Sequence, residues 1–428
     1  MKVCIVGAGI TGLVLSNFIK DSVIFEYDKI GGKIQTKYYD KFFVELGPDA
    51  IIFDQEKIQK IEQALGSIFE KKNFIRYNPT FLYMKNRLYI IPSNFREFLL
   101  TDLLSFFDKV GFIWNFLFRK AKYRGDESLE EFAINRFGKP FFERIIKPIF
   151  ETVFGTNSKK LMLHFVYPFV KKFEKGVFYR PTLMFNIEDG FYSLIQKIAK
   201  NKNIINEKVE KLIVRENGIV VNDSYFFDRI VLTGQAHTIS KILENTNFFD
   251  DRFIHIRDSL VSNLLSLNYH SSFIYIFILK SKININANGI IFVDDPFLKS
   301  ITFFSKKWFD SYDVEILRVF AKEKNEEKVI NRLSEFLAMF SYDFQKNMID
   351  YFSVFWENAL VDYDQNYLKF FENSREFLKE LEKVGVFIFG NFIGGTNILD
   401  RIIFAINNYG KVIQDRRSVS YTHLRAHE

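Results

Sequence analysis

The sequence contains a single cysteine among 428 residues. One thiol excludes an internal disulfide framework and any metal site built from several cysteines. Cys4 lies inside an apolar segment, where we expect it to be a small core residue. The histidines are equally uninformative about metals, because four of the six are scattered without metal-ligand spacing. The other two, His423 and His427, lie in residues 418–428, on which we build no metal site. We therefore predict no metal site and expect a structural role for His164, His237, His255 and His270.

Long uncharged apolar segments are also missing. The longest apolar stretch, Phe98 to Phe118, is interrupted by Asp102, Asp108 and Lys109, so we do not expect it to cross a bilayer. The apolar start, Met1 to Val6, is too short for a signal peptide. We expect a cytoplasmic protein that is either free or peripheral on the inner face of the cell membrane.

The composition is that of a globular protein with an unusual aromatic content. Hydrophobic residues make up 48% and charged residues 26% of the chain, which excludes a disordered or fibrous protein. The net charge of +7 suits an anionic lipid surface or an acidic substrate, but it is too diffuse to indicate nucleic acid. There are 52 Phe and 20 Tyr beside only 8 Pro. Either Phe replaces Leu in the cores, or the chain has an apolar pocket or a membrane-contacting face.

The first residues carry a dinucleotide-binding pattern. An apolar strand, Lys2 to Val6, precedes the motif Gly-Ala-Gly-Ile-Thr-Gly at 7–12, and an apolar helix and a second strand ending at Glu26 follow. In this context Gly7 allows a tight turn, Gly9 lets a pyrophosphate approach the backbone, and Gly12 lets the helix pack on the strand. The acidic side chain can accept hydrogen bonds from ribose hydroxyls. The alternative is a glycine-rich turn in an unrelated α/β domain.

Two further glycine segments follow the second strand. Gly31-Gly32-Lys33 offers flexible backbone and a cation next to the expected phosphates, and Gly47-Pro48 is a turn that can approach a planar ligand. Each segment alone could be an ordinary turn. Their order after the first motif is what carries information.

Taken together, the segments GGKIQT at 31–36 and ELGPDA at 45–50 resemble the protoporphyrinogen oxidase family of FAD flavoproteins, within the amine-oxidase-like superfamily. The resemblance is closest to the bacterial, Gram-positive type, whose substrate is coproporphyrinogen III as well as, or instead of, protoporphyrinogen IX. Asp49 stands where eukaryotic members usually carry Arg. The resemblance implies non-covalent FAD, held by Gly7, Ala8, Gly9, Ile10, Thr11, Gly12, Glu26, Gly31, Gly32, Lys33, Gly47, Pro48, Asp49, Ala50, Val209, Trp356, Gly390, Thr396, Asn397 and Ile398.

Two other segments resemble the substrate side of that family. IPSNFR, ending at Arg96, matches a segment whose arginine faces a substrate propionate, although a solvated arginine at a helix end would look the same. Residues 355–363 resemble the family's RWPxALPQY, with Val361 and Asp362 replacing Pro and Gln. Trp356 in this segment either packs near the flavin or the substrate, or belongs to the core.

The resemblance and the patterning together predict an α/β fold with interleaved domains. We expect a Rossmann-like FAD-binding domain of the GR2 type from residues 1–75, 182–240 and 384–417. Residues 76–90 and 241–383 would form an α+β substrate-binding domain, and 91–181 a helical subdomain. In that subdomain, 98–118 and the basic residues after it suit either a membrane interface or a buried helix pair. Residues 418–428 resemble a translated adapter sequence and are expected to be a non-native tail.

The function implied is FAD-dependent oxidation of a porphyrinogen to the porphyrin in haem biosynthesis. It would proceed in three two-electron steps, with oxygen as acceptor and no nucleic-acid partner. Flavin chemistry needs no side-chain triad, so no catalytic residue is predicted. The alternatives are a flavin amine oxidase, a carotenoid-type desaturase, or a flavin- or porphyrin-binding protein without turnover. The sequence does not choose between the two porphyrinogens and does not give the oligomeric state.

Overall fold

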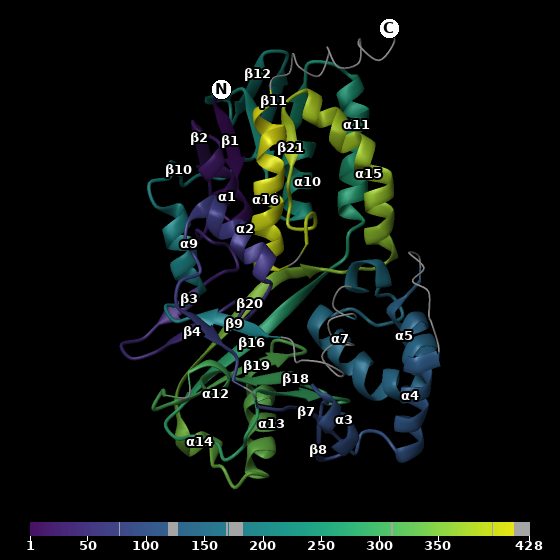
Figure 1. The fold of residues 1–428 in the computed structure, drawn as a ribbon. Coiled ribbons are helices and arrows are strands. Elements are labelled where there is room, and N and C mark those ends of the chain that lie inside the picture. The colour runs from purple at the N-terminus through teal and green to yellow at the C-terminus, as the bar shows by residue number, and fades with distance from the viewer. Residues whose placement is uncertain are drawn as a thin grey trace.

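A five-stranded parallel sheet forms the upper half of the computed structural model (Figure 1). The structure describes residues 1–76, 78–118, 127–167, 170, 183–309, 311–395 and 397–414. Every neighbouring pair in this sheet is parallel. Its strands come from three distant parts of the chain, in the order β10 (Ile204–Ile205), β2 (Ser22–Phe25), β1 (Val3–Val6), β14 (Arg229–Leu232) and β21 (Val386–Ile388).

Both faces of this sheet are covered, because alternate residues of its strands enter two different cores. Val3 and Ile5 enter a core with the helices α1 (Ile10–Phe18), α2 (Gln55–Leu65), α9 (Phe191–Ala199) and α16 (Ile398–Ile413). Cys4 points to the opposite core, as expected, and burial raises the pKa of its thiol. That core is completed by α10 (Ala236–Glu244), α11 (Arg252–Leu265), α15 (Gln365–Lys383) and a four-stranded sheet of β11 (Leu212–Arg215), β12 (Gly218–Val221), β13 (Tyr225–Phe227) and β15 (Thr246–Phe248).

A seven-stranded sheet forms the lower half. Its order is β20 (Met348–Val361), β16 (Tyr269–Leu279), β19 (Glu315–Ala321), β18 (Leu298–Phe303), β17 (Gly289–Phe292), β7 (Thr80–Met84) and β8 (Arg87–Ile90). Only β17 and β7 pair in parallel. One face packs on α13 (Glu326–Ala338) and α14 (Phe344–Asn347). The other face packs on α12 (Phe304–Trp308) and on the hairpin of β3 (Thr36–Tyr38) and β4 (Phe43–Glu45).

Two connections join the halves. The long antiparallel pair β16 and β20 extends from the lower sheet toward α15 and α16 (Figure 1). A three-stranded sheet of β5 (Ile51–Ile52), β9 (Met184–Ile187) and β6 (Lys72–Phe74) lies beside it. The α/β fold class is confirmed. The sheet order shows that the chain leaves the upper sheet after its first strands and returns to it later to add the others. The exact domain boundaries stay a prediction.

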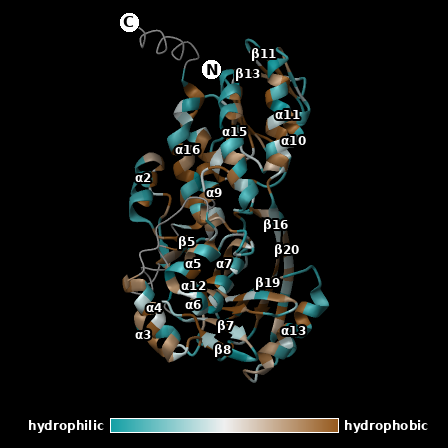
Figure 2. Ribbon diagram, turned by 90° about the vertical axis from the view of Figure 1, so that its right-hand side faces the viewer, coloured by the Kyte–Doolittle hydropathy of each residue, from teal (hydrophilic) through white to brown (hydrophobic). Residues whose placement is uncertain are grey.

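A group of helices forms the lower right of Figure 1: α3 (Phe95–Leu100), α4 (Phe106–Phe118), α5 (Leu129–Phe137), α6 (Lys139–Phe141) and α7 (Lys147–Phe154), with a π-helical turn (Phe142–Ile146) between the last two. The apolar stretch 98–118 is therefore two helices rather than one. Its residues divide between a buried and an exposed side: Phe98 and Phe112 are buried, while Phe106 and Phe107 are 74% and 82% exposed. The stretch therefore has a buried side and an exposed apolar side, and Figure 2 colours α3 and α4 as largely apolar. Contact of the exposed side with a membrane stays a prediction. Within the described ranges, no helix combines the length and the apolarity needed to cross a membrane.

Candidate functional site

The first glycine motif forms the turn between β1 and α1. Gly7 has φ +106°, which favours glycine, and its N–H donates to Phe25 O. A Cβ on Gly12 would lie 2.1 Å from Gly7 O, so this glycine is needed for the helix to pack on the turn. Gly9 caps α1, and a Cβ on Gly9 would meet no atom within 4 Å. The structure thus leaves open space at Gly9, next to a helix N-terminus, where unpaired N–H groups favour an anion. Binding of a phosphate there stays a prediction.

Glu26 follows β2 and is fixed against this turn. Its carboxylate accepts hydrogen bonds from Ala8 N at 2.8 Å and from Asp28 N at 2.9 Å. The acid therefore lies at the carboxyl end of the second parallel strand, where the dinucleotide fold holds a ribose. Val209 is buried just ahead of β11. Its contact with the FAD stays a prediction.

The second glycine segment lies across from the first. Gly31 and Gly32 have φ +90° and +57°, and a Cβ on Gly32 would be 4.0 Å from the Cα of Gly9. The Lys33 ammonium donates to Asn358 O at 2.7 Å and to Ala359 O at 2.6 Å. Burial lowers the pKa of Lys33 to about 8. Lys33 therefore ties this loop to the end of β20, a partner that the sequence did not indicate.

The third segment, from Gly47 to Ala50, is fixed by contacts with the second segment and with the lower sheet and α12. A Cβ on Gly47 would lie 1.8 Å from Lys33 O, so the two loops are in contact. The Asp49 carboxylate lies 3.0 Å from Lys307 Nζ and 3.2 Å from Arg318 Nη1. Burial alone would raise the pKa of Asp49, but these two cations outweigh it and lower the value to about 2. A carboxylate at this position is thus held charged by two cations from the lower sheet and α12.

The last segment, 390–398, returns to the first motif. Asn397 caps α16, and its side chain accepts from Asp400 N at 2.8 Å. Thr396 lies outside the described residues. Arg401, which the sequence did not single out, donates to Thr11 Oγ1 at 2.7 and 3.0 Å and to carbonyl groups of Phe389 and Gly390. The loop and the glycine motif are therefore joined through one buried side chain.

Of the two substrate-side predictions, one reaches these loops and one does not. The Trp356 indole N–H donates to Leu46 O at 2.8 Å, which places Trp356 next to the third segment. Arg96 is exposed on the first turn of α3, at the end of the molecule away from α1 (Figure 1). Asp362, which replaces the family's Gln, accepts from Thr156 Oγ1 at 2.9 Å and pairs with His270 Nδ1 at 2.8 Å. Through Asp362, His270 on β16 is thus linked to Thr156, which follows α7.

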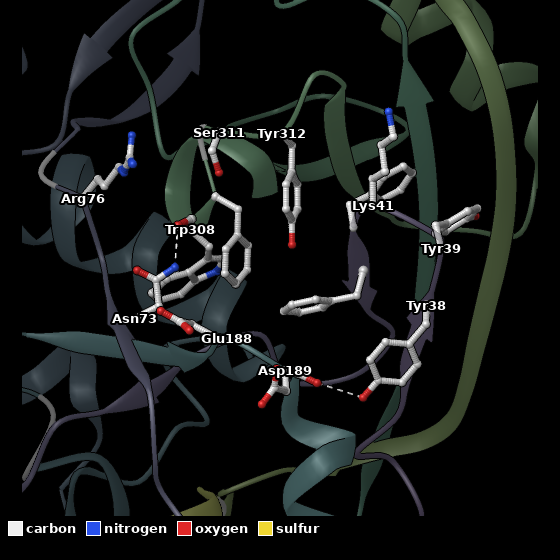
Figure 3. Close-up of a pocket in the computed structure, with 13 residues that line it drawn as sticks. Tyr38, Tyr39, Lys41, Asn73, Arg76, Glu188, Asp189, Trp308, Ser311 and Tyr312 are labelled. Carbon is white, nitrogen blue, oxygen red and sulfur yellow. Dashed lines mark hydrogen bonds between the residues drawn. The ribbon is translucent and has the colours of Figure 1, made fainter.

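A separate hollow of about 540 Å³ lies between the hairpin β3–β4 and the residues at the end of α12 (Figure 3). Aromatic side chains from the hairpin and from α12 and the residues after it make up most of its wall, with Glu188 and Asp189 at one edge. Trp308 stands between this hollow and Asp49, toward which its indole N–H points at 3.5 Å. None of the predicted cofactor residues lines it, so it is distinct from the space between the glycine loops.

Comparisons with known proteins agree with this geometry. Residues 14–335 match the family model of flavin-containing amine oxidoreductases. The chain is 30% identical over 221 residues to a coproporphyrinogen III oxidase of Staphylococcus aureus, covering 47% of this chain and 44% of that protein. It is 28% identical over 171 residues to the chloroplastic protoporphyrinogen oxidase 1 of Spinacia oleracea, covering 37% and 30%. The chain thus aligns with less than half the length of these curated relatives.

Solved structures extend the likeness to the whole fold. A chain from Exiguobacterium, provisionally named as a protoporphyrinogen oxidase, superposes with a TM-score of 0.75 at 19% identity, over 96% of this chain and 99% of that one. A UDP-galactopyranose mutase superposes with a TM-score of 0.72 at 13% identity, over 96% and 93%. Since these names denote different reactions, the fold does not choose the substrate. The family model, which covers most of the chain, does settle membership: the chain belongs to the flavin-containing amine oxidoreductases.

Proposed function

We propose that the protein binds FAD non-covalently and oxidises a porphyrinogen, either protoporphyrinogen IX or coproporphyrinogen III, to the corresponding porphyrin. The observation that carries the proposal is the convergence of glycine segments from residues 7–12, 31–33 and 47–50, with open space at Gly9. The curated relatives that are named as porphyrinogen oxidases support the substrate class.

The chain's own residues would bind and orient the cofactor. Gly9 and Gly32 would leave the backbone accessible to the pyrophosphate, and Glu26, which is fixed by Ala8 N, would accept from the adenosine ribose. The Gly47–Ala50 segment, held through Asp49, and the indole of Trp356 would fix the flavin end. When bound, FAD supplies a two-electron acceptor. The aromatic residues Phe320 and Trp356 on that face of the lower sheet would exclude water.

The reaction balances with oxygen as the terminal acceptor. A porphyrinogen loses six hydrogens, as six electrons and six protons, in becoming a porphyrin. Three oxygen molecules take these up in three two-electron steps and leave as three molecules of hydrogen peroxide. No side chain gains or loses a bond, which agrees with a site whose conspicuous residues hold backbone loops in place.

A single preparation tests the proposal. The purified protein should show a flavin absorbance spectrum, and denaturation should release the flavin into the supernatant. Adding protoporphyrinogen or coproporphyrinogen should give porphyrin fluorescence and three equivalents of peroxide, above the rate without enzyme. Bound flavin without turnover of either compound would indicate a binding protein or another substrate, such as an amine or a carotenoid, and would contradict the proposal.

We also propose that the protein contacts the membrane peripherally through α3 and α4. Exposed Phe106, Phe107, Trp114, Leu117 and Phe118, each between 62% and 82% exposed, form a large apolar surface. The basic residues that follow in the sequence, Arg119, Lys120, Lys122 and Arg124, lie outside the described residues.

Trp114 gives a direct test of this contact. It is 62% exposed, whereas Trp308 is buried. Vesicles containing phosphatidylglycerol should shift the tryptophan emission to the blue, and Trp114→Phe should abolish the shift. The double variant Phe106→Ser, Phe107→Ser should no longer float with vesicles, whereas the control Ile349→Ser, at a 58% exposed site, should float as wild type does. Unchanged flotation of the double variant would contradict membrane contact through these helices.

A further inference from the structure

Arg401 uses all of its hydrogen-bonding capacity on neutral oxygens. A guanidinium has five N–H donors. Here Nε and Nη2 donate to Thr11 Oγ1, Nη2 also donates to Phe389 O, and Nη1 donates to Gly390 O and Ile393 O. The side chain is only 6% exposed. The polar groups are therefore satisfied, but the positive charge is not neutralised by them.

Within the described part of the chain, no anion lies against the Arg401 guanidinium. Among the residues that the structure describes, no carboxylate forms an ion pair with Arg401, and the adjacent Asp400 is engaged by Lys57 and Asn397. Burial has the largest effect on the Arg401 guanidinium and lowers its pKa to about 10, so the side chain remains protonated at neutral pH. A buried cation without a counter-charge is costly in a protein interior.

The position of Arg401 in α16 adds to that cost. Asn397 caps the helix, so Arg401 lies at the end of its first turn, where the helix dipole disfavours a cation. The first turn of α1 lies alongside, because Thr11 accepts the guanidinium bonds and the two helices pack against each other (Figure 1). Two helix N-termini and one buried cation therefore meet at the glycine motif, and all three favour an anion there.

We propose that Arg401 is a positioning residue for the dinucleotide, whose pyrophosphate supplies the anion that this buried charge lacks. Arg401 acts through the first and last glycine loops, which it holds in place, rather than by direct contact with the ligand. It makes the site select a diphosphate over an uncharged nucleoside. The inference rests on the proposed function, since it assumes that the glycine loops hold FAD.

A comparison of ADP with adenosine isolates the effect of the Arg401 charge, because the two ligands share the nucleoside and differ only in the diphosphate. Calorimetry on the flavin-free full chain should show that Arg401→Met weakens ADP binding about tenfold and leaves adenosine binding within about twofold. Arg401→Lys should recover part of the ADP affinity, because it keeps the charge but not the planar fork. Arg401→Gln, which retains two N–H donors, serves as a second neutral variant in case the Met variant does not fold.

Arg229→Met is the matched control. Arg229 is equally buried and donates to the carbonyl groups of Val412 and Gln414, at the opposite end of the same helix. Residues 401 and 412 are about 17 Å apart along the helix axis, so the control should leave the preference for ADP over adenosine unchanged. Equal ADP affinity in wild type and the neutral variants, or an equal loss for both ligands, would overturn the role of Arg401. Wild-type protein that binds neither FAD nor ADP would instead overturn the proposed function.

Discussion

Arg318, in the middle of β19, places its Nη1 3.2 Å from the Asp49 carboxylate and donates from Nη2 to Gly47 O. Arg318 is 1% exposed, so both contacts lie in the interior. One guanidinium of the lower sheet thus holds both the backbone and the side chain of the segment expected to carry the flavin ring. Lys307 on α12 contacts the same carboxylate.

Asp49→Asn should therefore destabilise the fold strongly. The amide would leave the buried Arg318 and the half-buried Lys307 without their counter-charge, which costs about 3 to 5 kcal/mol in the free energy of unfolding. Urea unfolding of the flavin-free protein at pH 7 measures this. In the double variant Asp49→Asn, Arg318→Met, the loss in the free energy of unfolding should be clearly smaller than the sum of the losses in the two single variants. Additive losses would mean that Asp49 and Arg318 do not depend on each other.

Glu45 should give the stability a distinct pH dependence. Its carboxylate is fully buried and accepts from Phe191 N at 2.7 Å and Thr36 Oγ1 at 2.8 Å, and burial raises its pKa from 4.5 to about 7. Between pH 4.5 and about 7, Glu45 is therefore protonated in the folded state and ionised in the unfolded state. The free energy of unfolding should fall across this interval as the pH rises, by about 3 kcal/mol.

Denaturation of Glu45→Gln at pH 4.5 and pH 7.5 isolates this contribution. The amide can still accept from Phe191 N, so the variant should fold and should lack most of the decline seen in wild type. Glu188→Gln, at an exposed carboxylate near α9, is the control and should retain the wild-type decline. The same slope in Glu45→Gln and wild type would show that another group titrates.

The part of the site that the sequence predicted is the part made by neighbouring residues. β1, the glycine motif, α1 and β2 follow one another within 26 residues, so their pattern is local and specific. The predicted helix is present and begins at Ile10, because Gly9 serves as its cap. The glycine loops could be predicted for the same reason.

What the sequence did not reveal depends on residues far apart in the chain. Thr11 and Arg401 meet only because α1 and α16 pack together, and no spacing pattern marks an arginine as buried. β20 was not predicted as a strand. Several of its side chains are exposed, and Asn358 with φ +48° interrupts its alternation. The Lys33 contacts to Asn358 and Ala359 depend on that irregular strand end and were equally hidden.

Gly9→Ala should separate cofactor binding from folding. Gly9 has φ −70°, which alanine adopts freely, and its Cβ would enter empty space. The free energy of unfolding of the flavin-free variant should stay within about 1 kcal/mol of wild type, while the flavin content of the purified protein falls sharply. Gly12→Ala is the contrasting variant, because its Cβ would collide with Gly7 O and should destabilise the fold itself. Full flavin content in Gly9→Ala would place the pyrophosphate elsewhere.

Arg96→Ala tests the predicted contact with a substrate propionate. Because Arg96 is exposed on α3, its pairing with a carboxylate would be screened by water and worth about 0.2 to 1 kcal/mol. The variant should raise the KM for the porphyrinogen by about 1.4-fold to fivefold with little change in kcat, because a propionate is remote from the carbon that is oxidised. The KM of Arg96→Lys should lie between those of wild type and Arg96→Ala. Arg87→Ala, at an exposed arginine on neighbouring β8, is the control and should behave as wild type. Steady-state kinetics with flavin content measured on the same samples decides the matter: an unchanged KM at full flavin occupancy would remove Arg96 from the substrate site.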